Sequence, residues 1–292
     1  MNNSYKDISE ELQELLPKVF ENEEFEHLIA FSRGEFSGLL EPTFINKEDT
    51  EKIKDVIFTK KAYPMLSKYV LKDREAKQAI FAKPCDTRAL AYYLSENIID
   101  REQLIIIGIN GCPGLEDNAA CEECDIKNAV IADYTVGKKI EDNEDKEDKK
   151  DYPLANMTAE ERKEYFSREF SRCTQCYACR DACPVCYCDH CFVESNQPVW
   201  VENDSSTAND MVFHLMRTMH MPGRCVNCGA CEMACPEGIG MRSMASYLYH
   251  QAEKYFDYKP GLSPEQDILF STYDKEDPEP GFLLQGVKNN EI

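Results

Sequence analysis

Eight of the fifteen cysteines in this 292-residue chain form two motifs of identical spacing. The first motif is Cys173-x-x-Cys176-x-x-Cys179-x-x-x-Cys183 followed by a proline, and the second repeats this pattern from Cys225. In bacterial ferredoxins with this spacing, three cysteines of one loop bind one [4Fe-4S] cluster and the fourth binds the other cluster. The sequence therefore predicts two clusters with exchanged fourth ligands. The predicted ligands are Cys173, Cys176, Cys179 and Cys235 for the first cluster, and Cys225, Cys228, Cys231 and Cys183 for the second.

Two other uses of cysteine fit the doubled motif less well. A zinc-organised interaction module would usually combine two separated cysteine pairs or add histidines. Disulfides are rare in a reducing cytosol, and an odd number of cysteines cannot all pair within one chain. The proline after each fourth cysteine sets the direction in which the chain leaves that ligand, which suits a cluster loop.

Four more cysteines lie in the first half of the chain. Cys85 and Cys112 each follow a predicted strand, and Cys121 and Cys124 lie a short loop further on. In an open parallel sheet the exits of neighbouring strands meet at one edge, where ligands usually bind. These four residues are therefore predicted to bind a third [4Fe-4S] cluster. Alternatively, Cys85 is a small buried hydrophobe, and Cys121 and Cys124 form a redox pair or half of a zinc site.

The last three cysteines, Cys186, Cys188 and Cys191, directly follow the first motif and have His190 beside them. They are interpreted as a further metal or cluster site, completed by His190 or by a residue of a partner. They could instead replace one of the ligands assigned to the third cluster. The sequence leaves these alternatives open.

The first 140 residues alternate helical and strand patterns, which predicts an α/β domain. An amphipathic helix starts the chain, and a solvated run, EDNEDKEDKK at 141–150, ends the domain. We expect domains at 1–140 and 158–292, joined by an acidic linker at 141–157. The predicted strands are 27–31, 56–58, 79–82 and 104–109, with a helix at 87–95.

The second half predicts a bacterial ferredoxin-like dicluster domain made of short helices and loops, followed by a tail rich in Pro, Gly and acidic residues. Helices are expected at 211–220 and 242–255. His214 and His220 are interpreted as packed residues of a Met-rich helix rather than as metal ligands. Gly229 is expected to let the backbone approach the sulfur of a cluster.

Charge and motif content exclude several classes of function. The chain has 54 acidic residues against 33 Lys and Arg, which gives a formal net charge of -21. This charge disfavours binding to nucleic acid and to anionic membranes. The sequence has no long apolar run and no signal-peptide pattern, so a cytoplasmic location is expected. It also has no nucleophile elbow, no H-E-x-x-H and no P-loop, so no catalytic residue is predicted.

Several stretches of the sequence resemble the iron-sulfur beta subunits of anaerobic oxidoreductases. They are KPCDTRAL, IIGINGCPG with CEEC and an Ile-Ala-Asp-Tyr strand, CTQCYACRDACPVCYCDHCFV, and FHLMRTMHMPGRCVNCGACEMACPEGI with the DPEPGF tail. The family includes subunits of sulfhydrogenase and anaerobic sulfite reductase, of deazaflavin-linked hydrogenase and formate dehydrogenase, and of heterodisulfide reductase-like complexes. The resemblance covers most of the chain from about Lys83.

This resemblance implies a relay of clusters between a flavin- or nucleotide-binding subunit and a catalytic or bifurcating subunit. It also supports a cluster at Cys85, Cys112, Cys121 and Cys124. Some relatives hold a flavin, and FAD is one expectation here, although no motif in this sequence secures it. The alternative function is a flavin-containing beta subunit that itself reduces a diffusible acceptor such as a deazaflavin.

Overall fold

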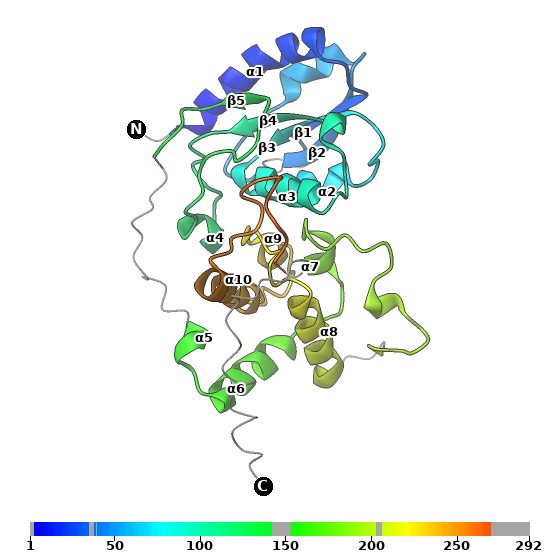
Figure 1. Cartoon of the computed structure of the whole chain (residues 1–292), viewed down its shortest axis with the longest axis vertical. Helices are drawn as coiled ribbons and strands as arrows, with labels where there is room; N and C mark the ends of the chain where they lie inside the picture. Colours follow the sequence, from blue (N-terminus) through cyan, green and yellow to red (C-terminus); the bar gives the residue numbers. More distant parts are fainter. Residues whose placement is uncertain (1–2, 35–37, 39, 142–152, 203–205, 270–292) are drawn as a thin grey trace.

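The computed structural model describes residues 3–34, 38, 40–141, 153–202 and 206–269. Figure 1 shows an α/β half at one end of the molecule and a helical half at the other, with close contact between them. Most of the acidic run at 141–150 and the whole DPEPGF tail lie outside the described residues. The described elements nevertheless agree with the predicted order of an α/β half followed by a half of short helices and loops.

The α/β half contains a five-stranded sheet with the order β2-β1-β3-β4-β5. The pair β1–β2 is antiparallel, whereas the pairs β1–β3, β3–β4 and β4–β5 are parallel. Every residue of β3 and β4 is buried, as expected for parallel strands that are covered on both faces. The strands are β1 His27–Arg33, β2 Leu40–Asn46, β3 Gln78–Ala82, β4 Leu104–Ile109 and β5 Tyr134–Val136.

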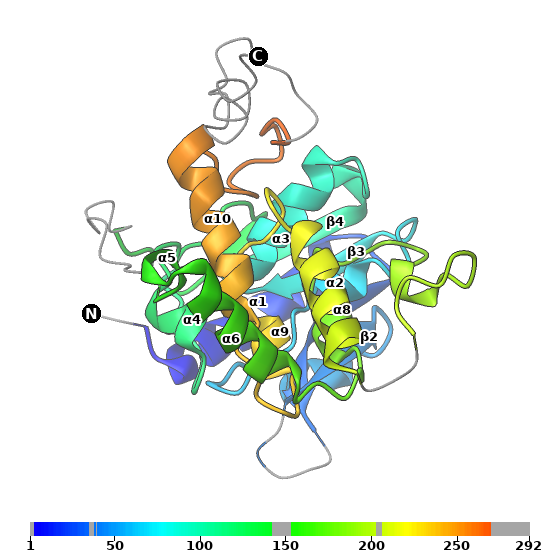
Figure 2. The same cartoon turned by 90° about the horizontal axis from the view of Figure 1, so that it is seen from below.

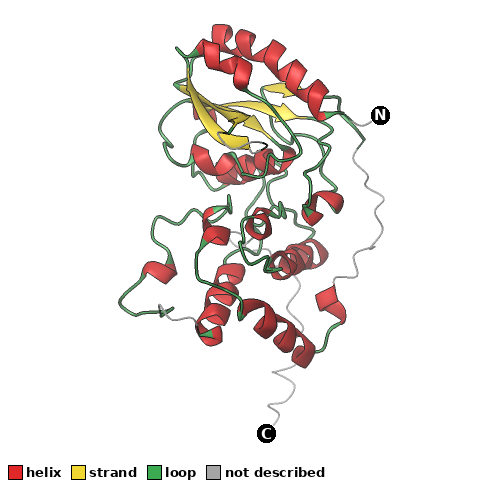
Figure 3. Ribbon diagram, turned by 180° about the vertical axis from the view of Figure 1, so that it is seen from behind, coloured by secondary structure: helices red, strands yellow, loops and turns green. Residues whose placement is uncertain are grey.

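Helices cover both faces of this sheet. The long helix α1, Tyr5–Asn22, begins at a capping box formed by Ser4 and Asp7, and it buries an apolar stripe against one face. The opposite face carries α2, Ser67–Val70, and α3, Pro84–Ser95, which lie between the sheet and the helical half (Figures 1 and 3). The remaining short helices of this half are η1 Thr50–Asp55, η2 Arg101–Gln103 and α4 Ala119–Glu122.

Most of the predicted elements of this half are confirmed. The predicted strands 27–31, 79–82 and 104–109 fall within β1, β3 and β4, and the predicted helix 87–95 falls within α3. Two predicted strands, one at 56–58 and one at Ile-Ala-Asp-Tyr, differ in the structure.

The predicted strand at 56–58 is wrong. Val56 forms one isolated antiparallel bridge with Ser32 instead of a strand. The segment is a loop whose apolar side chains, Val56 and Phe58, are buried in the core. The strand β2 was missed because it is an edge strand with one buried residue, Ile45, and so lacks an apolar alternation. The strand expected at Ile-Ala-Asp-Tyr begins instead at its last residue, Tyr134.

The second half consists of helices joined by loops, and no strand is assigned between 153 and 269 in its described part. Helix α6 packs on α8, and the two short helices α7 and α9 contact each other. Figure 2 shows α6, α8 and α10 in front of the sheet. The helices are α5 Pro153–Asn156, α6 Ala159–Phe170, α7 Ala178–Asp181, η3 Phe192–Glu194, α8 Thr207–Met219, α9 Ala230–Met233 and α10 Arg242–Phe256.

The helices predicted at 211–220 and 242–255 correspond to α8 and α10. Helix α8 starts earlier than predicted because Ser206 caps it by accepting a hydrogen bond from the backbone of Asn209. The short helix α5 falls within the range expected to be linker, and its Leu154 is buried. None of the described helices is long and apolar enough to span a bilayer.

Buried polar contacts join the two halves. The guanidinium of Arg88 in α3 donates to the carbonyl oxygens of Pro260 and Val226, and Tyr93 of the same helix donates to the Pro184 carbonyl. Such hydrogen bonds contribute about 0.5 to 1.5 kcal/mol each to the stability of the contact between the halves. The cysteine loops of the second half are therefore held firmly against the sheet edge of the first.

Candidate iron-sulfur sites

The two cysteine motifs fold into loops with the same backbone conformation. Gln175 and Asn227 have left-handed φ values of 51° and 54°, and Tyr177 and Gly229, two residues later, have 59° and 75°. The backbone N–H of Gln175 lies 3.4 Å from the sulfur of Cys173, and that of Asn227 lies 3.4 Å from the sulfur of its own loop's first cysteine, Cys225. A short helix, α7 or α9, follows at once in each loop. The sequence repeat is thus also a structural repeat.

The first loop lies beside the last cysteine of the second loop. Burial raises the pKa of Cys173, and the nearby thiols of Cys176 and Cys235 raise it further. Burial also raises the pKa of Cys179 to about 12, with added contributions from Cys173 and Cys235. The side chains predicted to share the first cluster are therefore brought together, including the one from the other loop.

The second loop lies beside the last cysteine of the first loop. Burial raises the pKa of Cys225 to about 12 and also raises the pKa values of Cys228 and Cys231, and the neighbouring Cys183 adds to each of these increases. Cys183 is only 8% exposed. The second predicted ligand set is thus gathered as well, with its exchanged member in place. Cys231 in turn interacts with Cys179, so the two groups are neighbours.

The four N-terminal cysteines line a single cavity beneath the sheet edge. Cys85 lies in the first turn of α3, directly after β3, and Cys112 follows β4. Because β3 and β4 are parallel neighbours, both exits reach the same edge, as expected. Cys121 comes from α4, and Cys124 lies just beyond it. Burial raises the pKa of Cys112 to about 11, and Cys121 and Cys124 raise it further.

A cysteine of the dicluster half also lines this N-terminal cavity. Cys228 lies in the cavity wall, and its charge contributes to the raised pKa of Cys85. The side-chain amide of Asn118, the N-cap of α4, donates to the Cys228 carbonyl at 3.2 Å. The N-terminal group and the second ferredoxin-type group therefore share a boundary.

Cations surround the N-terminal cavity, and sequence reasoning missed them. The side chain of Lys83 is 2% exposed and forms an ion pair with Asp86 at 3.1 Å. The charges of Cys85 and Cys112 help to keep the pKa of Lys83 raised in spite of burial, and Lys127 also lies in the cavity wall. The signal that could have revealed Lys83 is its place in KPCDTRAL, two residues before a candidate ligand.

Cys186, Cys188 and Cys191 do not line the N-terminal cavity. They lie with His190 around a separate cavity of about 730 Å³ on the surface of the helical half. Cys188 is exposed, whereas Cys186 is half-buried. Burial, together with the neighbouring Cys183, raises the pKa of Cys186 to about 11. Their role stays a prediction.

The two histidines of α8 have different surroundings. His214 is 2% exposed, stacks on Phe170 with ring centroids 4.3 Å apart, and has its Nε2 3.4 Å from the sulfur of Cys173. Burial and the neighbouring Arg217 lower the pKa of His214 to about 4, so its ring is neutral at pH 7. His220 is exposed at the end of the helix, where its ring contacts that of Phe192 edge-on.

The donor chemistry of the three cysteine groups fits iron-sulfur clusters. Thiolate sulfur is the ligand that these clusters take, and backbone N–H groups that point at sulfur are a usual means of stabilising it. In the described ranges, no three His, Cys, Asp or Glu side chains converge closely enough to hold one metal ion. The thiolates that bind a cubane lie at its separate corners rather than around one ion.

Comparisons with known proteins agree with this geometry. Residues 169–239 match the family model described as a 4Fe-4S dicluster domain. The chain is 34% identical over 113 residues to the F420-dependent formate dehydrogenase subunit beta of Methanocaldococcus jannaschii, which covers 37% of this chain and 28% of that protein. It is also 34% identical over 102 residues to the F420-dependent formate dehydrogenase 1 subunit beta of Methanococcus maripaludis, which covers 35% of this chain and 26% of that protein.

The matched segments thus span little more than a quarter of these relatives. The family match covers both cysteine motifs, and the relatives are beta subunits of the kind that the sequence was expected to resemble. The predicted similarity to iron-sulfur beta subunits is therefore confirmed, and residues 169–239 of this chain are a 4Fe-4S dicluster domain.

Proposed function

We propose that this chain is an electron-transfer subunit of a multi-subunit oxidoreductase and carries its electrons on three [4Fe-4S] clusters. Each cluster would supply a one-electron carrier, while the protein supplies ligands, burial and hydrogen bonds. The proposed ligand sets are Cys173, Cys176, Cys179 and Cys235; Cys225, Cys228, Cys231 and Cys183; and Cys85, Cys112, Cys121 and Cys124.

One observation carries this proposal: the three cysteine groups are contiguous. Cys228 lies in the wall of the N-terminal cavity, and Cys179 and Cys231 bring the two ferredoxin-type groups together. The second group is thus the middle of a row of three. At the outer end of the row, Cys176 is exposed. A row of neighbouring sites with one end at the surface suits a relay that exchanges electrons with a partner at that end.

The partners of this relay are inferred from the relatives. The relatives are named as subunits of F420-dependent formate dehydrogenases, so we place this chain in a complex of that general kind. A cytoplasmic location is proposed from the sequence. A flavin- or nucleotide-binding subunit would contact one end of the relay, and a catalytic or heterodisulfide reductase-like subunit the other. Cys186, Cys188 and Cys191 are kept as a proposed further metal site that His190 or a partner residue completes.

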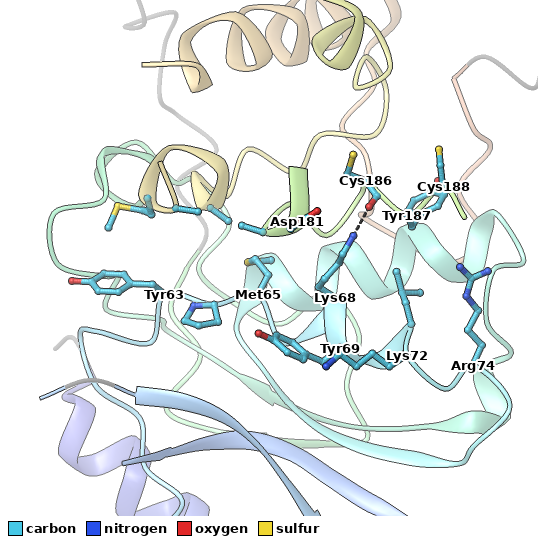
Figure 4. Close-up of a pocket in the computed structure, with 16 residues that line it drawn as sticks. Tyr63, Met65, Lys68, Tyr69, Lys72, Arg74, Asp181, Cys186, Tyr187 and Cys188 are labelled. Atoms are coloured by element: carbon cyan, nitrogen blue, oxygen red, sulfur yellow. Dashed lines mark hydrogen bonds between the residues drawn. The ribbon is translucent and has the colours of Figure 1, made fainter. Parts of the chain in front are cut away.

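A second candidate function would place a flavin in this chain itself, and one feature favours it. A groove of about 670 Å³ lies between the two halves, next to Cys186 (Figure 4). Tyr69 and Lys72 line it, with the ammonium of Lys72 5.0 Å from the Tyr69 ring. Aromatic and cationic groups together suit a planar anionic ligand. Lys68 also lines the groove, but its ammonium already donates a hydrogen bond to the Cys186 carbonyl and so offers less to such a ligand.

The flavin candidate is tested by the protein as purified under anaerobic conditions. Heat or acid treatment should release a fluorescent flavin at about one molecule per chain if the beta subunit holds its own flavin. Release of iron and sulfide without flavin would leave the relay as the function.

The relay proposal is tested by iron content and by the substitution Cys121→Ser. Wild-type protein prepared anaerobically should contain about twelve irons per chain, because each cubane holds four; about sixteen would add a cluster at Cys186, Cys188 and Cys191. Cys121→Ser should reduce the count to about eight and leave the dicluster half folded, since Cys121 lies in α4 of the α/β half and belongs to neither dicluster ligand set.

Cys188→Ser separates the third cluster from the proposed further metal site, because Cys188 is exposed and lies outside the three proposed ligand sets. If the wild type contains about twelve irons, this variant should keep about twelve; if the wild type contains about sixteen, it should lose about four. Unchanged iron in Cys121→Ser would remove the third cluster from the proposal. Colourless, iron-free wild-type protein would refute the proposal as a whole.

A further inference from the structure

Arg217 is a buried cation at the boundary between the two ferredoxin-type cysteine groups. It lies in the last turn of α8 and is only 4% exposed. The buried stripe of this helix also contains Phe213 and His214, so Arg217 faces the interior rather than solvent. A charged residue at such a position requires a partner, since an unpaired buried charge costs several kcal/mol.

The surroundings of Arg217 consist of thiols and a carbonyl group. Its Nη2 donates to the Cys179 carbonyl at 2.9 Å. The thiols of Cys183, Cys231 and Cys179 lie close enough to interact with its charge. Its Nε is buried and has no hydrogen-bond partner among the described residues.

The other buried arginines of the described chain have oxygen partners. Arg88, also 4% exposed, donates hydrogen bonds from its guanidinium to backbone carbonyl oxygens. The guanidinium of Arg242 pairs with two carboxylates, at 3.0 Å from Glu123 and 3.5 Å from Glu232. Arg217, by contrast, forms no ion pair with Asp or Glu in the part of the chain that the structure describes. The anions that would balance its charge are therefore the thiolates around it, and these belong to both cysteine groups.

We propose that Arg217 positions and neutralises the thiolates of both dicluster centres and thereby raises the reduction potentials of both. This inference rests on the proposed function, because it assumes that these thiolates bind clusters. Reduction adds one electron and no proton, so the site gains one negative charge. A fixed cation stabilises the more negative state and makes reduction easier.

One shared cation also ties the two potentials together. Arg217 interacts with Cys179 of the first ligand set and with Cys183 and Cys231 of the second. Its charge therefore shifts both potentials in the same direction. The second centre, with two of its ligands beside Arg217, should respond more strongly.

The test is a redox titration of the full-length protein followed by electron paramagnetic resonance. Arg217→Gln removes the charge but keeps a side chain that donates hydrogen bonds. We expect both dicluster potentials to fall, the second further than the first, with the iron content unchanged. The matched control is Arg172→Gln, which removes the same charge directly before Cys173. Because Arg172 is 43% exposed, water screens its charge and the potentials should stay in place.

Three outcomes decide the inference. Wild-type protein without iron would refute the proposed function itself. Unchanged potentials in an iron-loaded Arg217→Gln variant would refute the role of Arg217 alone. If Arg217→Gln loses iron, the wild-type protein is labelled with ¹⁵N-arginine and compared with Arg217→Lys by pulsed resonance. A ¹⁵N coupling to the reduced clusters that disappears in Arg217→Lys supports the role of Arg217, and no such coupling in the wild type overturns it.

Discussion

The two cysteine loops, 173–183 and 225–235, have the same backbone conformation but lie in different surroundings. Both use left-handed residues at the same two positions and both lead into a short helix. In the first loop, however, the second left-handed position is Tyr177, and the neighbouring Cys176 is exposed. In the second loop this position is Gly229, which packs against Asn118 of the α/β half.

This difference shows how a repeated motif acquires a direction. The cysteine spacing fixes the loop conformation in both copies, so that conformation alone cannot distinguish them. What differs is the covering: the N-terminal half closes over the second loop and leaves the first open. The second loop is therefore suited to exchange electrons inside the chain, and the first to exchange them with a partner.

The largest effect is expected where the two loops exchange a ligand. Cys183→Ala should remove the cluster of the second loop, although Cys183 belongs to the first, because its thiol lies beside Cys225, Cys228 and Cys231. The iron content should fall by about four per chain. Anaerobic iron analysis and electron paramagnetic resonance of the reduced protein measure this change.

Two further variants identify which resonance signal is lost. Cys225→Ala should remove the same signal as Cys183→Ala, which is that of the second cluster. Cys176→Ala should remove the signal of the first cluster. If Cys183→Ala and Cys176→Ala removed the same signal, each loop would bind its own cluster without exchange.

A smaller effect is expected at the covered loop. A Cβ added at Gly229 would lie 2.5 Å from Oδ1 of Asn118 and 2.9 Å from Cβ of Ala120, at a φ of +75°. Gly238→Ala is the matched control, because Gly238 has a φ of +59° and nothing within 4 Å of an added Cβ. Both variants incur the left-handed strain of about 1 to 2 kcal/mol. Gly229→Ala should lose about 1 to 3 kcal/mol more through overpacking.

The measurement is the thermal unfolding midpoint of the iron-loaded protein under anaerobic conditions. Equal midpoints for the Gly229→Ala and Gly238→Ala variants would mean that the contact between the second loop and α4 is loose. From the sequence, Gly229 is expected to let the backbone approach the sulfur of a cluster. In the structure it also packs against Asn118 and Ala120 of the α/β half.

Much of the candidate site could be predicted because it depends on local spacing or on simple topology. The eight ferredoxin-type cysteines were grouped from their motif, and the grouping of Cys85 with Cys112 followed from the exits of two parallel strands. Both inferences need only that neighbouring segments fold in the usual way. The same holds for the buried strands β3 and β4, whose continuous apolar runs are readily recognised.

Other features depend on tertiary packing and left no such trace. The edge strand β2 buries only Ile45, so its sequence carries little pattern. Arg217 is a charge within an otherwise Met-rich helix, and only the packing of α8 shows that it faces the thiols of both groups. The position of Cys228 in the N-terminal cavity depends on how the two halves pack against each other. The spacing of the cysteines in the sequence carries no information about this packing.

The smallest effect is expected when the open loop is made to resemble the covered one. Tyr177→Gly removes a left-handed strain of about 1 to 2 kcal/mol. It also removes the contact of the Tyr177 ring with Phe213, at 5.1 Å, and the contact with the guanidinium of Arg180, at 5.2 Å. Such contacts contribute about 0.5 to 1.5 kcal/mol each, so the two effects nearly cancel. The unfolding midpoint should therefore move much less than in Gly229→Ala. A loss as large as that of Gly229→Ala would mean that Tyr177 is itself a covering element and that the first loop is less open than its exposed Cys176 indicates.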